Sequence, residues 1–387
     1  MKILQINSVC GIRSTGRICT DLAEVLEQNG HECKIAYGRE SVPEKYQKYA
    51  IRIGSDFDVK MHALQSRLFD NSGFCSKRAT EKFIEWVKEY NPDIIHLHNI
   101  HGYYINIEVL FNYLEEADKP VVWTLHDCWT FTGHCAHYSY VQCDKWKVGC
   151  NNCQQRKSYP SSFLFDHSRK NWLKKKALFT RVKNMTLVTP SKWLAGEVRQ
   201  SFLNMYPVTV VPNGIDLNVF KPTPSNFRKK NNLEGKKIVL GVASAWNPLK
   251  GLNDFVALSK ILDENYKIVL VGVTAKQKKK LPKDILAIER TNNVKELAEI
   301  YTAADVFLNP TYQDTYPTVN IEAQACGTPV VTYRTGGSVE SVPKQNVVEQ
   351  GLLSEIKSLL TTTLCQKENF DNDKFELLKK YIDIYGA

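Results

Sequence analysis

Short apolar runs alternate with amphipathic stretches along the first part of the chain. A buried-strand run near the N-terminus is followed by apolar side chains at helical spacing from Ile18 to Leu26, and Gly30 is a typical stop for that helix. Later apolar runs end in polar, titratable residues. This alternation predicts a parallel sheet covered by helices on both faces. The expected strands are Ile3–Ile6, Cys33–Tyr37, Pro92–His98 and Pro120–His126.

A second series of the same kind follows Val210–Asp216. The stretch Lys221–Lys236, rich in Pro, Asn, Lys and Gly, is interpreted as the connection that precedes it. The chain therefore predicts an α/β protein with two doubly wound domains, of residues 1–212 and 213–370, facing each other across a cleft. The expected strands of the second series are Lys237–Val242, Tyr266–Val273, Ala304–Asn309 and Pro329–Tyr333.

The composition of the chain limits the classes of molecule that the protein is expected to bind. The 387 residues are 43% hydrophobic and 24% charged, as in soluble globular proteins, and no apolar run is long enough to span a bilayer. The first residues resemble a strand and not a signal peptide, which favours a cytoplasmic protein. The net charge of +10 favours anionic partners, but no nucleic-acid-binding motif is present. A phosphorylated small molecule and an anionic membrane surface are the expected partners, and nucleic acid is not.

The most specific pattern is a pair of acids after the expected strand Ala304–Asn309. Asp314 and Glu322 are eight residues apart, with a helix expected to begin between them. Ligands of parallel sheets bind beyond the carboxyl ends of the strands. Carboxylates there accept paired hydrogen bonds from vicinal hydroxyls, so this pair favours a sugar or ribose ligand. The pattern continues with Gly336 and Gly337.

Basic residues near the same strand ends favour a diphosphate. Lys250 precedes Gly251 at an expected helix start, where backbone amides and a lysine suit a phosphate group. Arg334 stands just before the glycine pair, where an ordinary surface arginine is the alternative to a contact with the ligand.

In the first domain, the strand Pro120–His126 ends in His126 and Asp127, where the fold places chemistry. His96, His98 and His101 are weaker candidates that line the same region. The residues from Gly11 to Arg17, which include Gly16, are expected to form the loop after the first strand.

These patterns, in this order, resemble family 4 of the retaining glycosyltransferases, which have the two-domain GT-B fold and take part in bacterial capsule, exopolysaccharide and O-antigen assembly. Asp314–Glu322 is similar to the E-x7-E block, with Asp at the first position. Thr124–His126 is similar to the T-x-H block, and the residues from Gly241 to Gly251 are similar to a phosphate motif in which Ser244 replaces an Arg. Asn213, Gly214 and Asp216 match an interdomain block.

The resemblance implies specific roles. Glu322 would bind the ribose hydroxyls, and Asp314 and His126 the donor sugar. Lys250 and the glycine loops would hold the diphosphate, with Arg334 in place of the charge missing at Ser244. The implied reaction is metal-independent transfer of a sugar from a nucleotide diphosphate to a lipid-linked saccharide, with retention of configuration. The helix of residues 371–387 is expected to return to the first domain.

Two other functions share the fold. One is a sugar-nucleotide epimerase or a phosphorylase, although no cofactor lysine for a phosphorylase is evident. The other is a non-catalytic nucleotide-sugar-binding protein, which would lack the paired acids or the pair of His126 and Asp127, and this chain has both.

A cysteine-rich insertion, residues 128–155, follows Asp127. The chain has eleven cysteines, and in a reducing compartment their clustering favours a metal site or free thiols over disulfides. The C-x2-C pair that ends the cluster suits structural zinc, and the segment resembles an insertion in some relatives. Four free thiols in an irregular loop are the alternative. The candidate ligands are Cys135, Cys143, Cys150 and Cys153.

Two further patterns involve clustered charged residues. Asp56-Phe-Asp58 is a D-x-D, the metal signature of another glycosyltransferase fold, but nothing around it supports a manganese site. The segment Arg169–Lys183 carries seven basic residues and no acid, so it is either a solvated face or a contact with anionic lipid at the membrane.

Overall fold

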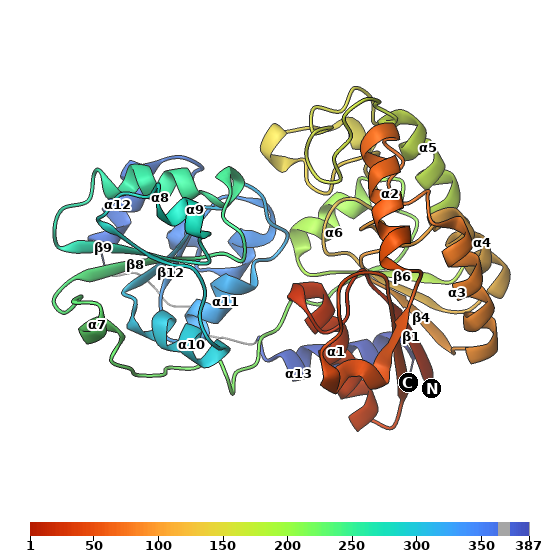
Figure 1. Cartoon of the computed structure of the whole chain (residues 1–387), viewed down its shortest axis with the longest axis horizontal. Helices are drawn as coiled ribbons and strands as arrows, with labels where there is room; N and C mark the ends of the chain where they lie inside the picture. Colours follow the sequence, from red (N-terminus) through yellow and green to blue (C-terminus); the bar gives the residue numbers. More distant parts are fainter. Residues whose placement is uncertain (363–371, 387) are drawn as a thin grey trace. The chain divides into compact units, whose positions relative to one another are not determined.

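The computed structural model describes residues 1–362 and 372–386. The chain forms two compact units. Unit 1 is Met1–Val211 with Phe375–Ala387, and unit 2 is Pro212–Lys374. The boundary expected between residues 370 and 371 lies outside the described residues. Each unit contains one parallel sheet with helices packed against it (Figure 1).

The sheet of unit 1 has seven strands in the order β3-β2-β1-β4-β5-β6-β7, and every neighbouring pair is parallel. The order reverses between β1 and β4, which is the point where such sheets bind ligands. The four expected strands are confirmed, while β3, β6 and β7 were not predicted. The strands are β1 Lys2–Ile6, β2 Glu32–Tyr37, β3 Ala50–Arg52, β4 Ile94–Leu97, β5 Val121–Thr124, β6 Met185–Thr189 and β7 Val208–Val210.

Helices cover both faces of this sheet. They are α1 Arg13–Gln28, α2 Asp56–Phe69, α3 Lys77–Tyr90, α4 Ile107–Ala117, α5 Ser168–Phe179 and α6 Lys192–Arg199, with 3-10 helices at Glu44–Tyr49, Ser139–Val141 and Lys145–Lys147. Asp58 belongs to the capping box of α2, because its carboxylate accepts from the backbone N–H of Ser55, and Asp56 pairs with Arg52. Both acids of the D-x-D therefore have structural roles at the start of α2 that do not involve a metal ion.

The expected loop from Gly11 to Arg17 is wrong in its extent, because α1 already begins at Arg13. Gly16 lies in the first turn of this helix. A Cβ atom on Gly16 would come within 3.0 Å of the Val9 side chain and 3.2 Å of the Val9 carbonyl oxygen. Glycine thus lets the helix start close against the loop that follows β1.

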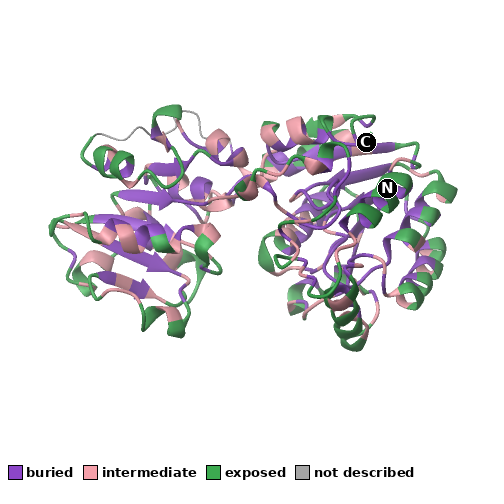
Figure 2. Ribbon diagram, turned by 90° about the horizontal axis from the view of Figure 1, so that it is seen from above, coloured by how far each residue is buried: buried purple, intermediate pink, exposed green. Residues whose placement is uncertain are grey.

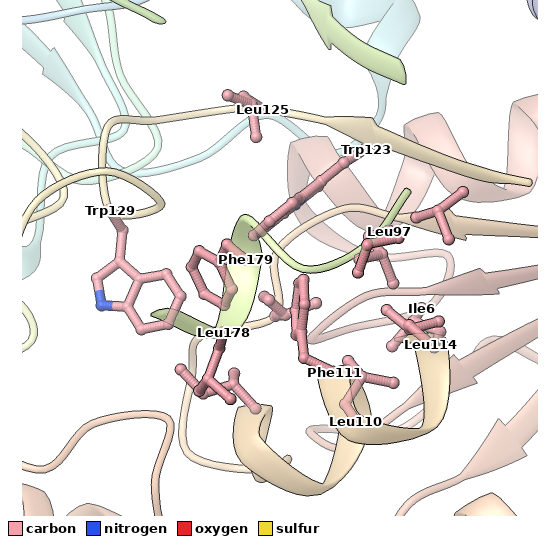
Figure 3. Packing of buried hydrophobic residues seen from close by; sticks show 14 of the residues in the cluster. Ile6, Leu97, Leu110, Phe111, Leu114, Trp123, Leu125, Trp129, Leu178 and Phe179 are labelled. Carbon is pink, nitrogen blue, oxygen red and sulfur yellow. The ribbon is translucent and has the colours of Figure 1, made fainter. Parts of the chain in front are cut away.

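Aromatic side chains fill the core between the sheet and α4 and α5. Phe111 of α4, Trp123 of β5 and Phe179 of α5 pack together, with ring centroids 4.4 to 5.5 Å apart (Figure 3). All three are buried to 1% exposure or less. Burial of such large side chains stabilises the sheet that carries His98 and His126 at its strand ends.

The C-terminal helix α13, Lys374–Ile384, packs onto unit 1, where Leu377 and Leu378 join a core cluster. Two tyrosines tie it to the central strands. The Tyr381 hydroxyl lies 2.9 Å from Oγ1 of Thr124 at the end of β5, and the Tyr385 hydroxyl lies 2.7 Å from Nδ1 of His96 in β4. Residues near the end of the chain thus support the layer beneath the candidate site.

Unit 2 has a six-stranded parallel sheet in the order β10-β9-β8-β11-β12-β13, which reverses between β8 and β11. The four expected strands are confirmed. The strands are β8 Lys237–Val242, β9 Tyr266–Val271, β10 Ile285–Ile288, β11 Val306–Asn309, β12 Val330–Tyr333 and β13 Val347–Val348. The helices are α7 Phe227–Lys230, α8 Leu252–Ser259, α9 Ala275–Lys278, α10 Val294–Ala303, α11 Thr318–Ala325 and α12 Leu353–Leu360, with 3-10 helices at Pro248–Lys250, Gly336–Ser341 and Lys344–Asn346.

The expectation that Lys221–Lys236 connects two domains is wrong, because this segment is part of unit 2. Leu233 is buried in the unit 2 core, and Arg228 donates to the carbonyl oxygens of Ala303 and Lys236. Its polar composition reflects a surface turn and not a linker.

The central strands of both units are largely buried, whereas most exposed residues lie on helices and loops (Figure 2). The edge strands β3 and β7 are only partly buried. Within residues 1–362 and 372–386, no helix has the length and apolar character needed to cross a bilayer.

Candidate active site

The first group of candidate residues lies at the carboxyl ends of β8 and β11 in unit 2. The ammonium group of Lys250 lies 2.8 Å from Oδ2 of Asp314, and the two side chains are 38% and 17% exposed. The other oxygen of Asp314 accepts from the backbone N–H of Tyr316. An acid and a base that are 64 residues apart in sequence therefore meet at the switch point of the sheet.

Backbone packing brings them together. Gly251 has φ +75°, and a Cβ atom there would lie 2.4 Å from the carbonyl oxygen of Pro310. The N–H of Tyr312 donates to the carbonyl oxygen of Leu249 at 2.9 Å. The loop after β11 therefore lies directly against the turn that carries Lys250, and only glycine fits at the point of contact.

Glu322 lies on α11, which begins at Thr318, between the two acids as expected. The Tyr301 hydroxyl donates to Oε2 of Glu322 at 3.0 Å. Tyr301 is fully buried, and burial, reinforced by the nearby Glu322 carboxylate, raises the pKa of this phenol well above its ordinary value. Tyr301 is thus a neutral donor that orients Glu322, whose side chain remains partly exposed.

The remaining candidates of unit 2 lie in the loops that follow β8 and β12. Ser244 is exposed in the loop after β8. Gly336 begins a 3-10 helix with φ +46°, and the N–H of Gly337 donates to the backbone oxygen of Asp314 at 3.3 Å. Arg334 is 60% exposed, and its guanidinium pairs with Glu349. A diphosphate at this position would have to compete with that carboxylate for Arg334.

The second group lies at the carboxyl ends of β4 and β5 in unit 1. Nδ1 of His98 lies 3.1 Å from Nε2 of His126, and Nε2 of His98 lies 3.0 Å from Oε1 of Gln5. The amide nitrogen of Gln5 donates to the carbonyl oxygen of Cys19 at 2.9 Å, which fixes the amide orientation. A polar chain thus runs from inside β1 to the strand end of β5.

Burial keeps these histidines neutral. It lowers the pKa of His126 to about 4 and that of His98 well below its ordinary value. Since Gln5 presents a carbonyl oxygen, His98 carries its proton on Nε2 and accepts at Nδ1. His126 must then donate from Nε2, so its Nδ1 is a hydrogen-bond acceptor.

Asp127 is held in the turn that follows β5. Its Oδ2 accepts from Nε2 of His101 at 2.8 Å, and its Oδ1 accepts from the backbone N–H of Trp129 at 2.9 Å. Burial alone would raise the pKa of Asp127, but His101, assisted by His137 and the backbone N–H of Trp129, outweighs that effect and lowers the pKa to about 2. Nδ1 of His101 in turn contacts the Tyr159 hydroxyl at 3.1 Å.

A buried lysine supports the same loop. Lys175 of α5 donates to the carbonyl oxygens of Trp129 and Thr132 at 2.7 and 3.1 Å, and its ammonium lies 3.2 Å from the centre of the Trp129 ring. Burial lowers the pKa of Lys175 to about 7. One residue of the basic run Arg169–Lys183 is therefore interior, not part of a charged face.

The roles of Gln5 and of the tyrosines of α13 were not predicted from sequence. Gln5 is a polar residue inside an apolar strand run, and that break in the pattern is the signal that marks it. Tyr381 and Tyr385 carried no comparable signal, because their partners are more than 250 residues away.

The four candidate zinc ligands line one small cavity of about 20 Å³, together with His134. The Cys135 thiol donates a hydrogen bond to the Cys153 sulfur, which lowers the pKa of Cys153 to about 7. As they stand, however, no three His, Cys, Asp or Glu side chains in the described part of the chain are grouped closely enough to hold a metal ion. Zinc binding would therefore require these side chains to move.

Two family models match the chain in succession. Residues 15–219 match "Glycosyltransferase Family 4", and residues 224–359 match "Glycosyl transferases group 1". The two units have the doubly wound sheets and strand-end residues that the sequence predicted. The protein belongs to glycosyltransferase family 4.

Curated relatives match parts of the chain. A putative colanic acid biosynthesis glycosyl transferase, WcaC, of Escherichia coli K12 is 26% identical over 232 residues, which cover 56% of this chain and 55% of that protein. A D-inositol 3-phosphate glycosyltransferase of Stackebrandtia nassauensis is 33% identical over 155 residues, which cover 35% of each chain. The matches thus span about half the length of these relatives or less.

Solved structures share the fold over the whole chain. Anabaena Alr3699/HepE in complex with UDP has a TM-score of 0.68 at 15% identity and covers 100% of both chains. Sucrose-phosphate synthase of Thermosynechococcus elongatus has a TM-score of 0.65 at 17% identity, covering 99% of this chain and 94% of its own. These likenesses establish the GT-B fold.

Proposed function

We propose that the protein is a retaining glycosyltransferase that moves a sugar from a nucleotide-diphosphate donor to a hydroxyl of a lipid-linked saccharide in surface polysaccharide synthesis. The observation that carries this proposal is the ion pair between Lys250 and Asp314 at the β8/β11 switch point. Glu322 lies on α11, the helix that follows β11. Family membership, the glycosyl transferase WcaC and the UDP complex of HepE support it.

Each side chain has a role that suits its chemistry. Glu322, oriented by Tyr301, accepts from the ribose hydroxyls. Lys250 exchanges Asp314 for the donor diphosphate, and the start of α8 beside it adds backbone N–H groups. Asp314, released from the ion pair, accepts from the hydroxyls of the donor sugar.

His126 accepts a hydrogen bond from a donor hydroxyl at Nδ1, since its Nε2 donates to His98. Such a contact orients the sugar while the bond to the diphosphate breaks, and orientation lowers the barrier more than it strengthens binding. Asp127 is ionised and lies beside His126, where it can attract the hydroxyl of the acceptor.

In this proposal, protein groups supply the positive charge that stabilises the departing diphosphate anion, so transfer requires no metal ion. Lys250 is the principal group, and Arg334 adds to it when it leaves Glu349. A structural zinc on the four cysteines of residues 135–153 is a separate proposal. Thiolates are the ligands that zinc prefers, and all four line one cavity.

A non-catalytic nucleotide-sugar-binding protein or an epimerase would use the same unit 2 residues. The test begins with the purified protein and a panel of UDP-, GDP- and ADP-sugars, and the melting temperature is measured with each sugar nucleotide. A ligand that binds only the native state raises the melting temperature by mass action. The stabilising donor is then supplied with lipid-linked saccharide acceptors, and the product anomer is read by NMR.

A glycosidic product with the donor's anomeric configuration supports the proposal. Stabilisation without product from any acceptor favours a binding protein, and an altered free sugar nucleotide favours an epimerase. No shift with any sugar nucleotide would overturn the proposal. His126→Ala, which leaves unit 2 unchanged, is the matched control for catalysis.

A further inference from the structure

One arginine at the strand ends of unit 1 has no partner for its charge. Arg39 lies just after β2, and its backbone N–H donates to the carbonyl oxygen of Ser8 at 3.0 Å, in the loop that follows β1. Its side chain is half-buried, and its guanidinium makes no hydrogen bond or ion pair with any residue that the structure describes. The nearby acid Glu40 is already paired with Arg13. Because a charge withdrawn from water needs a counter-charge, the position of Arg39 indicates an anionic ligand.

The guanidinium of Arg39 lies beside the loop that follows β4. Gly102 in this loop has φ +113°, and a Cβ atom there would lie 3.6 Å from Nη1 of Arg39 and 3.2 Å from Cβ of Ser8. The next residue, Tyr103, has φ +70°, which a bulky side chain rarely adopts. Such strained backbone is found mainly at functional sites, where the surrounding structure imposes it. The ends of β1, β2 and β4 thus converge on Arg39 at the switch point of the sheet.

Two tyrosines lie close enough to Arg39 for its charge to act on them. Burial raises the pKa of Tyr103, and the charges of Arg67 and Arg39 oppose that shift. Burial also raises the pKa of Tyr159, and Arg39 is again among the cations that oppose it. The Tyr159 hydroxyl contacts Nδ1 of His101 at 3.1 Å, whereas the Tyr103 hydroxyl has no hydrogen bond within the described part of the chain. A neutral phenol donor is therefore free near the guanidinium.

This group adjoins the residues proposed to meet the acceptor hydroxyl. His101 joins Tyr159 to Asp127, since its Nε2 donates to Oδ2 of that acid at 2.8 Å. The charges of Asp127 and Arg39 both act on the Tyr159 phenol. Asp127 is itself held by His101 and by a backbone N–H, and it makes no ion pair with Arg39. The positive charge of Arg39 thus remains available close to the proposed position of the acceptor.

A guanidinium is planar and pairs with two oxygens of one phosphate or carboxylate group, and a phenol adds a further donor. We propose that Arg39 and Tyr103 bind an oxyanion that the acceptor carries near its reacting hydroxyl. The acceptor is then an anionic saccharide, and Arg39 determines that specificity. The phosphate of a lipid-diphosphate link and the carboxylate of an acidic sugar both present this chemistry. The inference takes the transfer reaction from the proposed function, whereas the anion site itself stands on the unpaired guanidinium and the strained loop.

The first test needs no sugar donor. Phenylglyoxal, which modifies arginine side chains, is applied to the full chain, and peptide mass spectrometry follows the modification of each arginine. Inorganic pyrophosphate or methyl glucuronide should slow the modification of Arg39 at least threefold, whereas the uncharged methyl glucoside should not. Arg78 is the matched control, because it is exposed on α3 and has no ion pair in the described chain, and its rate should not change. An unchanged rate at Arg39 with both anions overturns the anion site.

The second test compares two variants of Arg39 in transfer. Arg39→Gln removes the charge, and Arg39→Lys keeps it but cannot pair with two oxygens. The acceptors are a lipid-diphosphate-linked saccharide, a saccharide that ends in a uronic acid, and a neutral alkyl glycoside. The wild-type preference in kcat/KM for an anionic over the neutral acceptor should fall at least tenfold in Arg39→Gln, mainly through KM, and less in Arg39→Lys. Arg78→Gln removes an unpaired charge from the same unit and should keep the preference.

The acceptor whose KM responds identifies the source of the oxyanion. Arg39→Gln should melt at the wild-type temperature, because Arg39 has no side-chain partner to lose among the described residues. A wild type that uses neutral and anionic acceptors equally, or a preference that survives in Arg39→Gln, overturns the inference.

The two tests separate this inference from the proposed function. Arg39→Gln should retain stabilisation by the donor, since the donor contacts proposed for this chain lie in unit 2. If no sugar nucleotide stabilises the protein, the proposed function fails, while slowed modification of Arg39 by either anion leaves the anion site standing.

Discussion

Nδ1 of His98 lies 3.1 Å from Nε2 of His126, and this contact determines which nitrogen of His126 carries the proton. The carbonyl of Gln5 places the proton of His98 on Nε2, so His98 accepts and His126 donates. A residue in the first strand therefore sets the chemistry of a residue 121 positions later. The buried chain leaves His126 neutral and presents its Nδ1 as an acceptor.

We expect His126→Ala to reduce turnover by two or more orders of magnitude, about 3 kcal/mol or more in the barrier. Nucleotide diphosphate affinity should be nearly unchanged, because the nucleotide contacts proposed for this chain lie in unit 2. Calorimetric titration of the nucleotide, beside an assay of donor hydrolysis or transfer, measures both. Equal losses in both would assign His126 to the fold, and full activity would place the site elsewhere.

In the variant Gln5→Met, His126 should no longer be held in a single tautomer. His98 loses the acceptor that keeps the His98 proton on Nε2, so either nitrogen of His98 can carry that proton. The nitrogen NMR shift of His126 Nδ1 should be of the unprotonated type in the wild type and intermediate in the variant. Turnover should fall by about tenfold with unchanged nucleotide affinity, as expected for lost positioning.

Cys33→Ala is the matched control for Gln5. It removes the Cys33 sulfur, which lies 3.3 Å from the Gln5 amide nitrogen, but it keeps the bond from that nitrogen to Cys19. The His126 shift should then stay as in the wild type. A protonated Nδ1 on wild-type His126 would disprove the proposed chain.

Glu322→Ala should weaken UDP or GDP binding as well as turnover, since it removes a charge-assisted contact that the ground state already makes. The expected loss is about 1.5–3 kcal/mol in nucleotide affinity. Tyr301→Phe keeps the carboxylate and removes only the hydroxyl that orients it, so its loss should be smaller. Unchanged affinity in the Glu322 variant would remove this residue from the ribose.

Arg334→Ala tests whether this arginine replaces the charge missing at Ser244. If it stabilises the departing diphosphate, the substitution should raise the activation barrier by several kcal/mol and lower turnover accordingly. Nucleotide binding should change little. Glu349→Gln is the control, because it frees Arg334 from its ion pair, and turnover should be kept or raised. Near-wild-type turnover in the Arg334 variant would mean that Arg334 only pairs with Glu349 and does not act on the diphosphate.

Elemental analysis of the purified protein should find about one zinc per chain if the four cysteines form a structural site. Cys150→Ser should lose it, whereas Cys75→Ser, at a buried thiol outside the insertion, should keep it. Transfer itself should survive brief treatment with EDTA. Absence of zinc in the wild type would leave free thiols, and EDTA inactivation reversed by manganese would contradict metal-independent transfer.

The sequence by itself determined the two parallel sheets and the residues at their strand ends. After its first residue, a strand run such as Lys237–Val242 is apolar because parallel strands are buried on both faces, and this pattern is visible without a structure. Lys250, Asp314 and His126 could be named because each lies in the loop or turn that comes after such a run. Short edge strands, such as Ala50–Arg52, lack that signal and were missed.

Tertiary structure alone decided which of these residues meet. Lys250 contacts Asp314 because Gly251 admits the backbone at Pro310, and Gln5 reaches His98 because β1 and β4 are neighbours in the sheet. It also showed that Lys175 is interior and that α2 turns Leu64 outward. Hydrogen bonds and burial depend on distances between segments far apart in the chain, and local sequence patterns do not encode those distances.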